Sequence, residues 1–124
     1  MSWIEKRSFF SLGVAIFIAV FIFYVSSLIV EPGTGGQSIK PLIYHSFIFT
    51  ALSFFLSIAI IRAKNVRLAP LVILIGILYG VSDELHQLLV PGRLFSGHDI
   101  FLDTTGVLIG ITAYLFTLDV RNII

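Results

Sequence analysis

The stretch FFSLGVAIFIAVFIFYVSSLIV, residues 9–30, holds 22 consecutive residues without a charge. A helix needs about 20 apolar residues to cross the hydrocarbon core of a membrane, which is about 30 Å thick. Signal peptides have apolar regions of only about 7 to 15 residues. We therefore expect this stretch to be a retained transmembrane helix rather than a cleaved leader.

Three further apolar stretches of similar length follow along the chain. The first of them contains His45 but no charged residue, and the next is apolar only as far as Val81. Pro and Gly, which break helices, crowd the connection after Val30. The sequence predicts a single all-α membrane domain over residues 1–124. We expect four transmembrane helices in an up-down bundle, at about 9–30, 42–61, 68–90 and 99–118.

The composition agrees with a membrane protein. The chain is 57% hydrophobic and 12% charged, with a mean hydropathy of +1.04, whereas soluble domains carry about 25% charged residues. Eight basic and seven acidic residues leave a net charge of +1, so nucleic acid is excluded as a partner. The absence of cysteine excludes a disulfide framework, a thiolate metal site and a cysteine nucleophile.

The basic residues predict the orientation, because Lys and Arg accumulate on the cytoplasmic side of a membrane. Six of them would lie on one side of the predicted bundle, and only Lys40 and Arg93 on the other. We therefore expect a multi-pass protein of the cell (plasma) membrane with both termini cytoplasmic, and connections 31–41 and 91–98 facing outward. The six are Lys6, Arg7, Arg62, Lys64, Arg67 and Arg121.

The ionisable residues outside the cytoplasmic rim gather at one membrane level. Four of the seven acidic residues lie between residues 83 and 103, and the three histidines belong to the outward half of the predicted topology. A carboxylate at the bilayer centre costs about 2.5 to 3.5 kcal/mol on insertion scales, so it should face the bundle interior or a wet cavity. This placement predicts an outward-facing polar site.

The third predicted helix carries a polar and small face. Gly76, Gly80, Asp83 and Gln87 recur at i, i+4, i+7 and i+11, which places them on one side of a helix. Glu84 lies about 100° further round the helix than Asp83, so the two carboxylates should point to different neighbours.

The fourth predicted helix repeats this spacing in the reverse order, with Asp99, Asp103, Gly106 and Gly110. Because consecutive spans run antiparallel, we expect the glycines of the two helices to meet and permit close backbone approach. The two helices should then open outward into a polar cleft lined by Asp83, Gln87, Asp99 and Asp103.

Two residues from other segments could complete this site. Arg93 follows a Pro-Gly turn and offers a planar fork that suits carboxylate or phosphate. His45 should lie at a depth comparable to that of Asp103, although spacing alone does not show that they meet. Asp99 could instead act as an N-cap with support from the helix dipole.

Residues 79–87, YGVSDELHQ, and residues 90–93, VPGR, resemble the signature of the VanZ-like family of membrane proteins. In that family a Tyr-Gly-x-x-Asp-Glu-x-x-Gln run leads into Val-Pro-Gly-Arg, and then into Asp-x-x-x-Asn-x-x-Gly-x-x-x-Gly. The resemblance covers residues 40–110 in the family's order. The last motif begins here at Asp99 and includes Gly106.

The chain departs from the family pattern at a few positions. Asp103 stands where the family has Asn, which adds a carboxylate, and Phe49 stands where it often has Tyr. An upstream Lys and His of the family correspond here to Lys40 and His45, five residues apart instead of the commoner three. The family takes its name from an accessory protein that gives resistance to the glycopeptide teicoplanin. The resemblance therefore implies a cell-envelope context and does not imply a reaction.

The first functional hypothesis is a membrane protein that binds or acts on an anionic cell-envelope amphiphile, such as a lipid-linked precursor or a glycopeptide-type drug. Arg93 would hold the anionic group, and a buried acid would serve as general base. The candidate catalytic residues are Asp83, Glu84 and Asp103. The candidate binding residues are His45, Gln87, Arg93 and Asp99, and the helix-packing residues are Gly76, Gly80, Gly106 and Gly110.

Two alternatives stay open, and the sequence does not decide whether the protein is an enzyme. The first is a metal-assisted membrane enzyme, in which His45 and the acids would supply ligands for Mg²⁺, Ca²⁺, Mn²⁺ or Zn²⁺. No compact motif such as His-Glu-x-x-His occurs, so we predict no metal ligand and no cofactor. The second is a non-enzymatic carrier or assembly factor, which could form a homo-oligomer. The expected partner in each case is a membrane lipid or a lipid-linked envelope molecule.

Overall fold

The computed structural model describes residues 3–28, 39–92 and 97–123. Four long helices make up this part of the chain: α1 (Trp3–Ser26), α2 (Ile39–Ile61), α3 (Ala69–Gln87) and α4 (Gly97–Ile123). A short 3-10 helix, η1 (Val66–Leu68), precedes α3. Each long helix contains a segment that is long and apolar enough to cross a membrane. The predicted all-helical fold with four transmembrane helices is confirmed.

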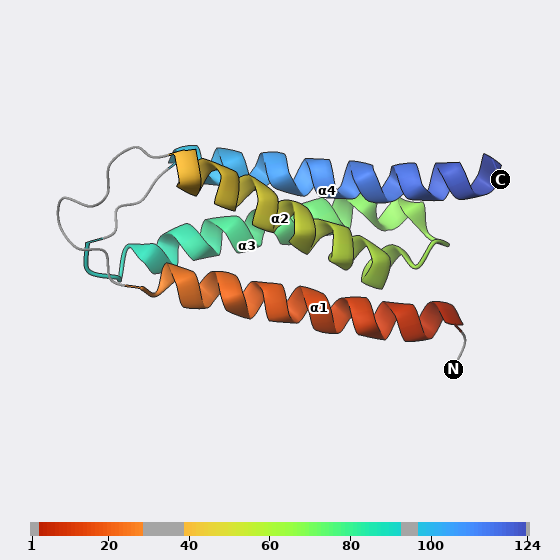
Figure 1. Ribbon diagram of the computed structural model, residues 1–124, viewed down its shortest axis with the longest axis horizontal. Coiled ribbons are helices and arrows are strands. Elements are labelled where there is room, and N and C mark those ends of the chain that lie inside the picture. Colours follow the sequence, from red (N-terminus) through yellow and green to blue (C-terminus); the bar gives the residue numbers. More distant parts are fainter. Residues whose placement is uncertain (1–2, 29–38, 93–96, 124) are drawn as a thin grey trace.

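The helices alternate in direction, so that α1 begins and α4 ends at the same end of the bundle (Figure 1). α2 packs against all three other long helices, most extensively against α4. α1 and α4 lie on opposite sides of α2 and α3 (Figure 1). α2 and α4 both start at the end of the bundle where α1 and α3 finish. Within α2 and α4, residues with higher numbers therefore lie further from this end.

Some helix limits differ from the predicted ones. α1 begins at Trp3, before the apolar run, and α4 continues to Ile123, because helical hydrogen bonding does not stop where the apolar run stops. α3 ends at Gln87 instead of Val90, and the residues after it form turns. Pro91 keeps Val90 out of the helix, since the residue before a proline avoids the α-helical conformation. The predicted extension of the first helix to residues 29 and 30 lies outside the described part.

The bundle interior holds two apolar clusters, one around Phe49 and Ile22 and the other around Ile61 and Tyr114. Large apolar side chains such as Phe17 face outward along the spans. This distribution is expected in lipid, where apolar surface costs nothing and polar groups must find partners inside the bundle.

The predicted contact between the glycines of α3 and α4 is wrong. A Cβ atom on Gly76 would lie 2.7 Å from Val107 Cγ2, so a valine of α4, and not a glycine, fills this position. A Cβ atom on Gly106 would lie 2.5 Å from the carbonyl oxygen of Ser46, and one on Gly110 would overlap the Ser53 hydroxyl. The glycines of α4 therefore pack against α2.

A stripe of small hydroxyl residues on α2 explains this choice of partner. Ser46, Thr50, Ser53 and Ser57 recur at i, i+4, i+7 and i+11, and each of the last three donates its hydroxyl to a carbonyl of its own helix. These local hydrogen bonds leave a compact surface with satisfied hydroxyls. Small residues on both helices let the backbones approach closely, as is typical of membrane helices.

Candidate functional site

Buried polar side chains from all four long helices gather at the end of the bundle opposite the two termini. We call this the polar end, and we call its side chains the polar cluster. Ser26 and Gln87 are the last residues of α1 and α3, and Asp99 lies in the first turn of α4. The cluster is therefore close to the helix ends. Its members are Ser26, His45, Asp83, Glu84, Gln87, Asp99 and Asp103, all buried except the half-buried Asp99.

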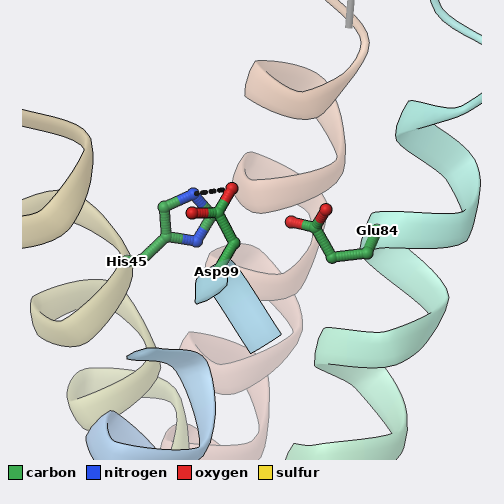
Figure 2. A group of neighbouring side chains, drawn as sticks. All are labelled: His45, Glu84 and Asp99. Atoms are coloured by element: carbon green, nitrogen blue, oxygen red, sulfur yellow. Dashed lines mark ion pairs between the residues drawn. The ribbon is translucent and has the colours of Figure 1, made fainter. Parts of the chain in front are cut away.

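The imidazole of His45 lies between two carboxylates of α4. Its Nδ1 atom is 2.7 Å from Oδ1 of Asp103, and because an ionised carboxylate only accepts, Nδ1–H is the donor. Its Nε2 atom is 3.6 Å from Oδ2 of Asp99 (Figure 2). The hydrogen bond to Asp103 thus fixes the orientation of the ring and directs Nε2 toward Asp99.

Glu84 approaches the same imidazole from α3. Its side chain is fully buried and its carboxylate points toward Asp99 and His45 (Figure 2). One ligand atom from each of these three residues lies within 4.8 Å of the other two. The three residues, which we call the triad, come from α2, α3 and α4, so tertiary packing rather than a local motif brings them together.

Asp83 faces a different neighbour. Ser26 of α1 donates its hydroxyl to Oδ1 of Asp83 at 2.5 Å. Gln87 donates its amide to Oδ2 of Asp83 at 3.2 Å and to the Ser26 hydroxyl at 3.4 Å. Asp83 therefore joins α3 to α1, while Glu84 points into the bundle centre. This division agrees with the predicted angular offset between the two acids.

The other two histidines lie outside the cluster. Nε2 of His86 is 2.9 Å from the hydroxyl of Ser27, which itself donates to the carbonyl of Phe23. The His86 ring also stacks on Phe23, with the ring centroids 4.2 Å apart. His98 is exposed near the start of α4.

The structure corrects the predicted cleft between the third and fourth helices. Asp83, Gln87 and Asp103 are each less than 5% exposed, so they belong to a packed interior and do not line an open cleft. The reason is that α1 and α2 supply partners, Ser26 and His45, that fill the space between the acids.

The structure excludes the N-cap alternative for Asp99, and it does not describe the side chains of two other predicted residues. Asp99 is inside the first turn of α4, so it is not the N-cap of that helix. Arg93 and the side chain of Lys40 lie outside the described residues.

The polar end carries an excess of negative charge. Among the side chains that the structure describes, four carboxylates lie in the cluster, and every Lys and Arg lies toward the opposite end. Oδ2 of Asp103 is buried and has no hydrogen-bond partner within the described ranges. It lies beside Gly80, where an added Cβ atom would come within 3.2 Å of it. Within the described residues, the cluster therefore presents mainly acceptor oxygens, with His45 as the basic side chain among them.

Sequence reasoning missed Ser26 and the contribution of α1. The buried face of α1 carries small and apolar residues at helical spacing, and Ser26 ends it. Tyr79 further ties α3 to α1 by donating its hydroxyl to the carbonyl of Ala19. The available signal was the recurrence of serine on the buried face of a mainly apolar helix. These serines are Ser8, Ser11 and Ser26.

The comparisons with known proteins agree with this architecture. No curated protein and no solved structure matches the chain. The family model described as VanZ/LLP1 matches residues 3–118, which include α1, α2, α3, most of α4 and every residue of the polar cluster. The chain therefore belongs to the VanZ/LLP1 family.

Proposed function

We propose that this protein binds an anionic amphiphile of the cell envelope at its polar end, and that this end faces outward. The orientation is supported by the basic residues, six of which lie toward the end with the termini. The position of the site is supported by the closeness of the polar cluster to the helix ends, which is the level of the lipid headgroups. A lipid-linked precursor and a glycopeptide-type drug both fit this description.

The observation that carries the proposal is a groove that begins beside the polar cluster. It has a volume of about 490 Å³ and lies between α2 and α4 on the outer surface of the bundle. It extends from the level of His45 and Asp103 toward the bundle middle, so an acyl chain could lie in it while the headgroup stays at the helix ends beside the cluster. Its lining residues are Ile43, Ser46, Phe47, Thr50, Leu102 and Ile109.

In this proposal the acids have separate roles. Glu84 and Asp103 are the candidates for a general base, because both carboxylates lie near the imidazole of His45. Asp83 accepts hydrogen bonds on both oxygens and holds α1 against α3, so it acts as a positioning residue. Arg93 is the candidate contact for the anionic group. Resistance of the teicoplanin type would follow if the amphiphile is the drug or its lipid-linked target.

Photocrosslinking tests the binding proposal. Protein in nanodiscs is irradiated with phosphatidylglycerol or phosphatidylcholine that carries a diazirine on one acyl chain. We expect phosphatidylglycerol to label the groove residues more strongly, and Ile109→Trp, which fills the groove, to reduce this labelling severalfold. Phe116→Trp is the matched control, because Phe116 is an exposed residue of the same helix outside the groove. Equal labelling by the two lipids, or an equal effect of the two variants, would refute the proposal.

Cysteine labelling tests the orientation, since the natural chain has no cysteine. Leu89 at the polar end and Val66 at the other end are both exposed. In intact cells, a membrane-impermeant maleimide should label Leu89→Cys and should label Val66→Cys only after permeabilisation. The reverse pattern would place the polar end in the cytoplasm and contradict the proposed orientation.

A further inference from the structure

The ligand atoms of the triad lie close enough for side-chain movements to bring them around one metal ion. Two ligands on one tetrahedral Zn²⁺ lie about 3.4 Å apart when each is about 2.1 Å from the metal. The selected atoms of His45, Glu84 and Asp99 lie within 4.8 Å of one another. Rotation of the two carboxylates by small amounts would therefore bring all three within coordination distance of one ion.

The imidazole is already oriented as a metal ligand would be. Asp103 accepts the Nδ1–H of His45, which leaves the lone pair of Nε2 for coordination when the ring is neutral. Nε2 lies 3.6 Å from Asp99, which is too long for a hydrogen bond between them. A carboxylate that holds one nitrogen while the other faces the ligand position is the usual second shell of a histidine on zinc.

A second observation is the unpartnered oxygen of Asp103, the residue that holds Nδ1 of His45. This side chain is 1% exposed, and its Oδ2 atom finds no hydrogen-bond partner in the part of the chain that the structure describes. Carboxylates buried inside the bundle are costly unless a positive charge compensates them. A divalent ion next to His45 would offset two negative charges and would strengthen the interaction between His45 and Asp103.

We propose that His45, Glu84 and Asp99 bind a divalent transition-metal ion, Zn²⁺ or Mn²⁺, with Asp103 as the residue that positions the imidazole. One nitrogen and two carboxylate ligands favour these ions over Mg²⁺ and Ca²⁺, which prefer oxygen ligands alone. Three protein ligands leave a coordination position open, as in catalytic zinc sites. That position could accept an oxygen of an anionic headgroup, a link that rests on the proposed function. The metal site itself does not depend on that function.

Metal titration of the purified full chain tests this site. Protein in detergent is stripped with a chelator, and binding of Zn²⁺ is measured by calorimetry and that of Mn²⁺ by electron paramagnetic resonance. We expect about one tightly bound ion per chain. Asp103→Asn should weaken binding about 10- to 100-fold, as for other groups that orient a ligating histidine. Glu84→Gln and Asp99→Asn should weaken it further, because each removes a ligand.

The control is His86→Gln, which removes a histidine at the same end that lies outside the triad and should leave the affinity unchanged. Circular dichroism checks that each variant is folded, and the half-buried Asp99 makes Asp99→Asn the mildest of the ligand variants. The proposal is overturned if the folded natural protein binds neither ion, or if Asp99→Asn and Glu84→Gln bind as tightly as His86→Gln. Binding that appears only in Lys40→Ala or Arg93→Ala would also overturn it, because a basic side chain would then be the natural occupant.

Discussion

The two ends of the bundle differ in the exposure of their charged residues. At the end with the termini, Lys6, Arg62, Lys64 and Arg67 are exposed and surround the helix ends. At the polar end, three of the four acids of the cluster are buried, and acids there are linked to other helices, as in the pair of His45 with Asp103. Exposed charges at a membrane surface need no partner, so the first group can be explained by topology alone.

Buried acids require a different explanation. Apolar residues of similar volume would stabilise the fold equally well. The reason is that the free-energy cost of desolvating a buried charge often exceeds the free energy gained from its ion pair. This contrast between the ends is the one expected if the polar cluster serves the proposed binding function and the basic end sets the proposed orientation. Each prediction below pairs a change in or beside the polar cluster with a matched change outside it.

Loss of Asp103 should have the largest effect. Asp103→Ala leaves His45 buried without its hydrogen-bond acceptor, and breaking a buried pair in this way costs about 3 to 5 kcal/mol. Lys64→Ala removes an exposed charge at the other end and should change the free energy of unfolding by less than about 0.5 kcal/mol. Thermal unfolding in one detergent compares the two variants. Equal losses of stability would remove the distinction between the ends.

A bulky residue at Gly106 should have the next largest effect. This glycine lies one turn beyond Asp103, where a Cβ atom would be 2.5 Å from the Ser46 carbonyl, so Gly106→Leu should push α4 away from α2. Overpacking of this kind costs about 1 to 3 kcal/mol. Gly13 on α1 has no atom within 4 Å of an added Cβ, so Gly13→Leu is the control and should be nearly neutral. Denaturant titration followed by helicity measures both, and a neutral Gly106→Leu would contradict the packing of α4 on α2.

The smallest expected effect is that of Ser26→Ala. It removes the hydroxyl that donates to Asp83, and hydrogen bonds between membrane helices contribute about 1 kcal/mol. Ser82→Ala is matched to it, because Ser82 is exposed and bonds only to the carbonyl of Tyr79 within its own helix. Unfolding measurements should separate the two serines by this amount. If they do not differ, α1 is not tied to the polar cluster through Asp83.

Membrane physics made much of the fold predictable from the sequence. The thickness of the hydrocarbon core gave the number of spans, and the cost of a charge in lipid predicted that the acids between residues 83 and 103 face the bundle interior or a wet cavity. Helical periodicity also placed Asp99, Asp103, Gly106 and Gly110 on one face, and these residues do share the face that meets α2.

The pairing of the faces could not be predicted from periodicity. A helical repeat tells which residues share a face but not which helix covers that face, so the glycines of α4 were assigned to α3 although they pack on α2. The stripe of small residues that begins at Ser46 was the sequence signal for α2 as the partner, because faces of small residues pack closely against one another in membranes. The role of Ser26 was missed for the same reason, because the helix that supplies the hydrogen-bond partner of a serine is known only once the packing is known.

The central claim is that three helices bring His45, Glu84 and Asp99 together around one position at the polar end. Anomalous X-ray diffraction at the zinc absorption edge, from crystals grown with Zn²⁺, tests it most directly. We expect an anomalous peak bounded by His45 Nε2 and the two carboxylates, with Asp103 still holding Nδ1. Side chains of the triad that diverge from one another, with no peak between them, would contradict the account.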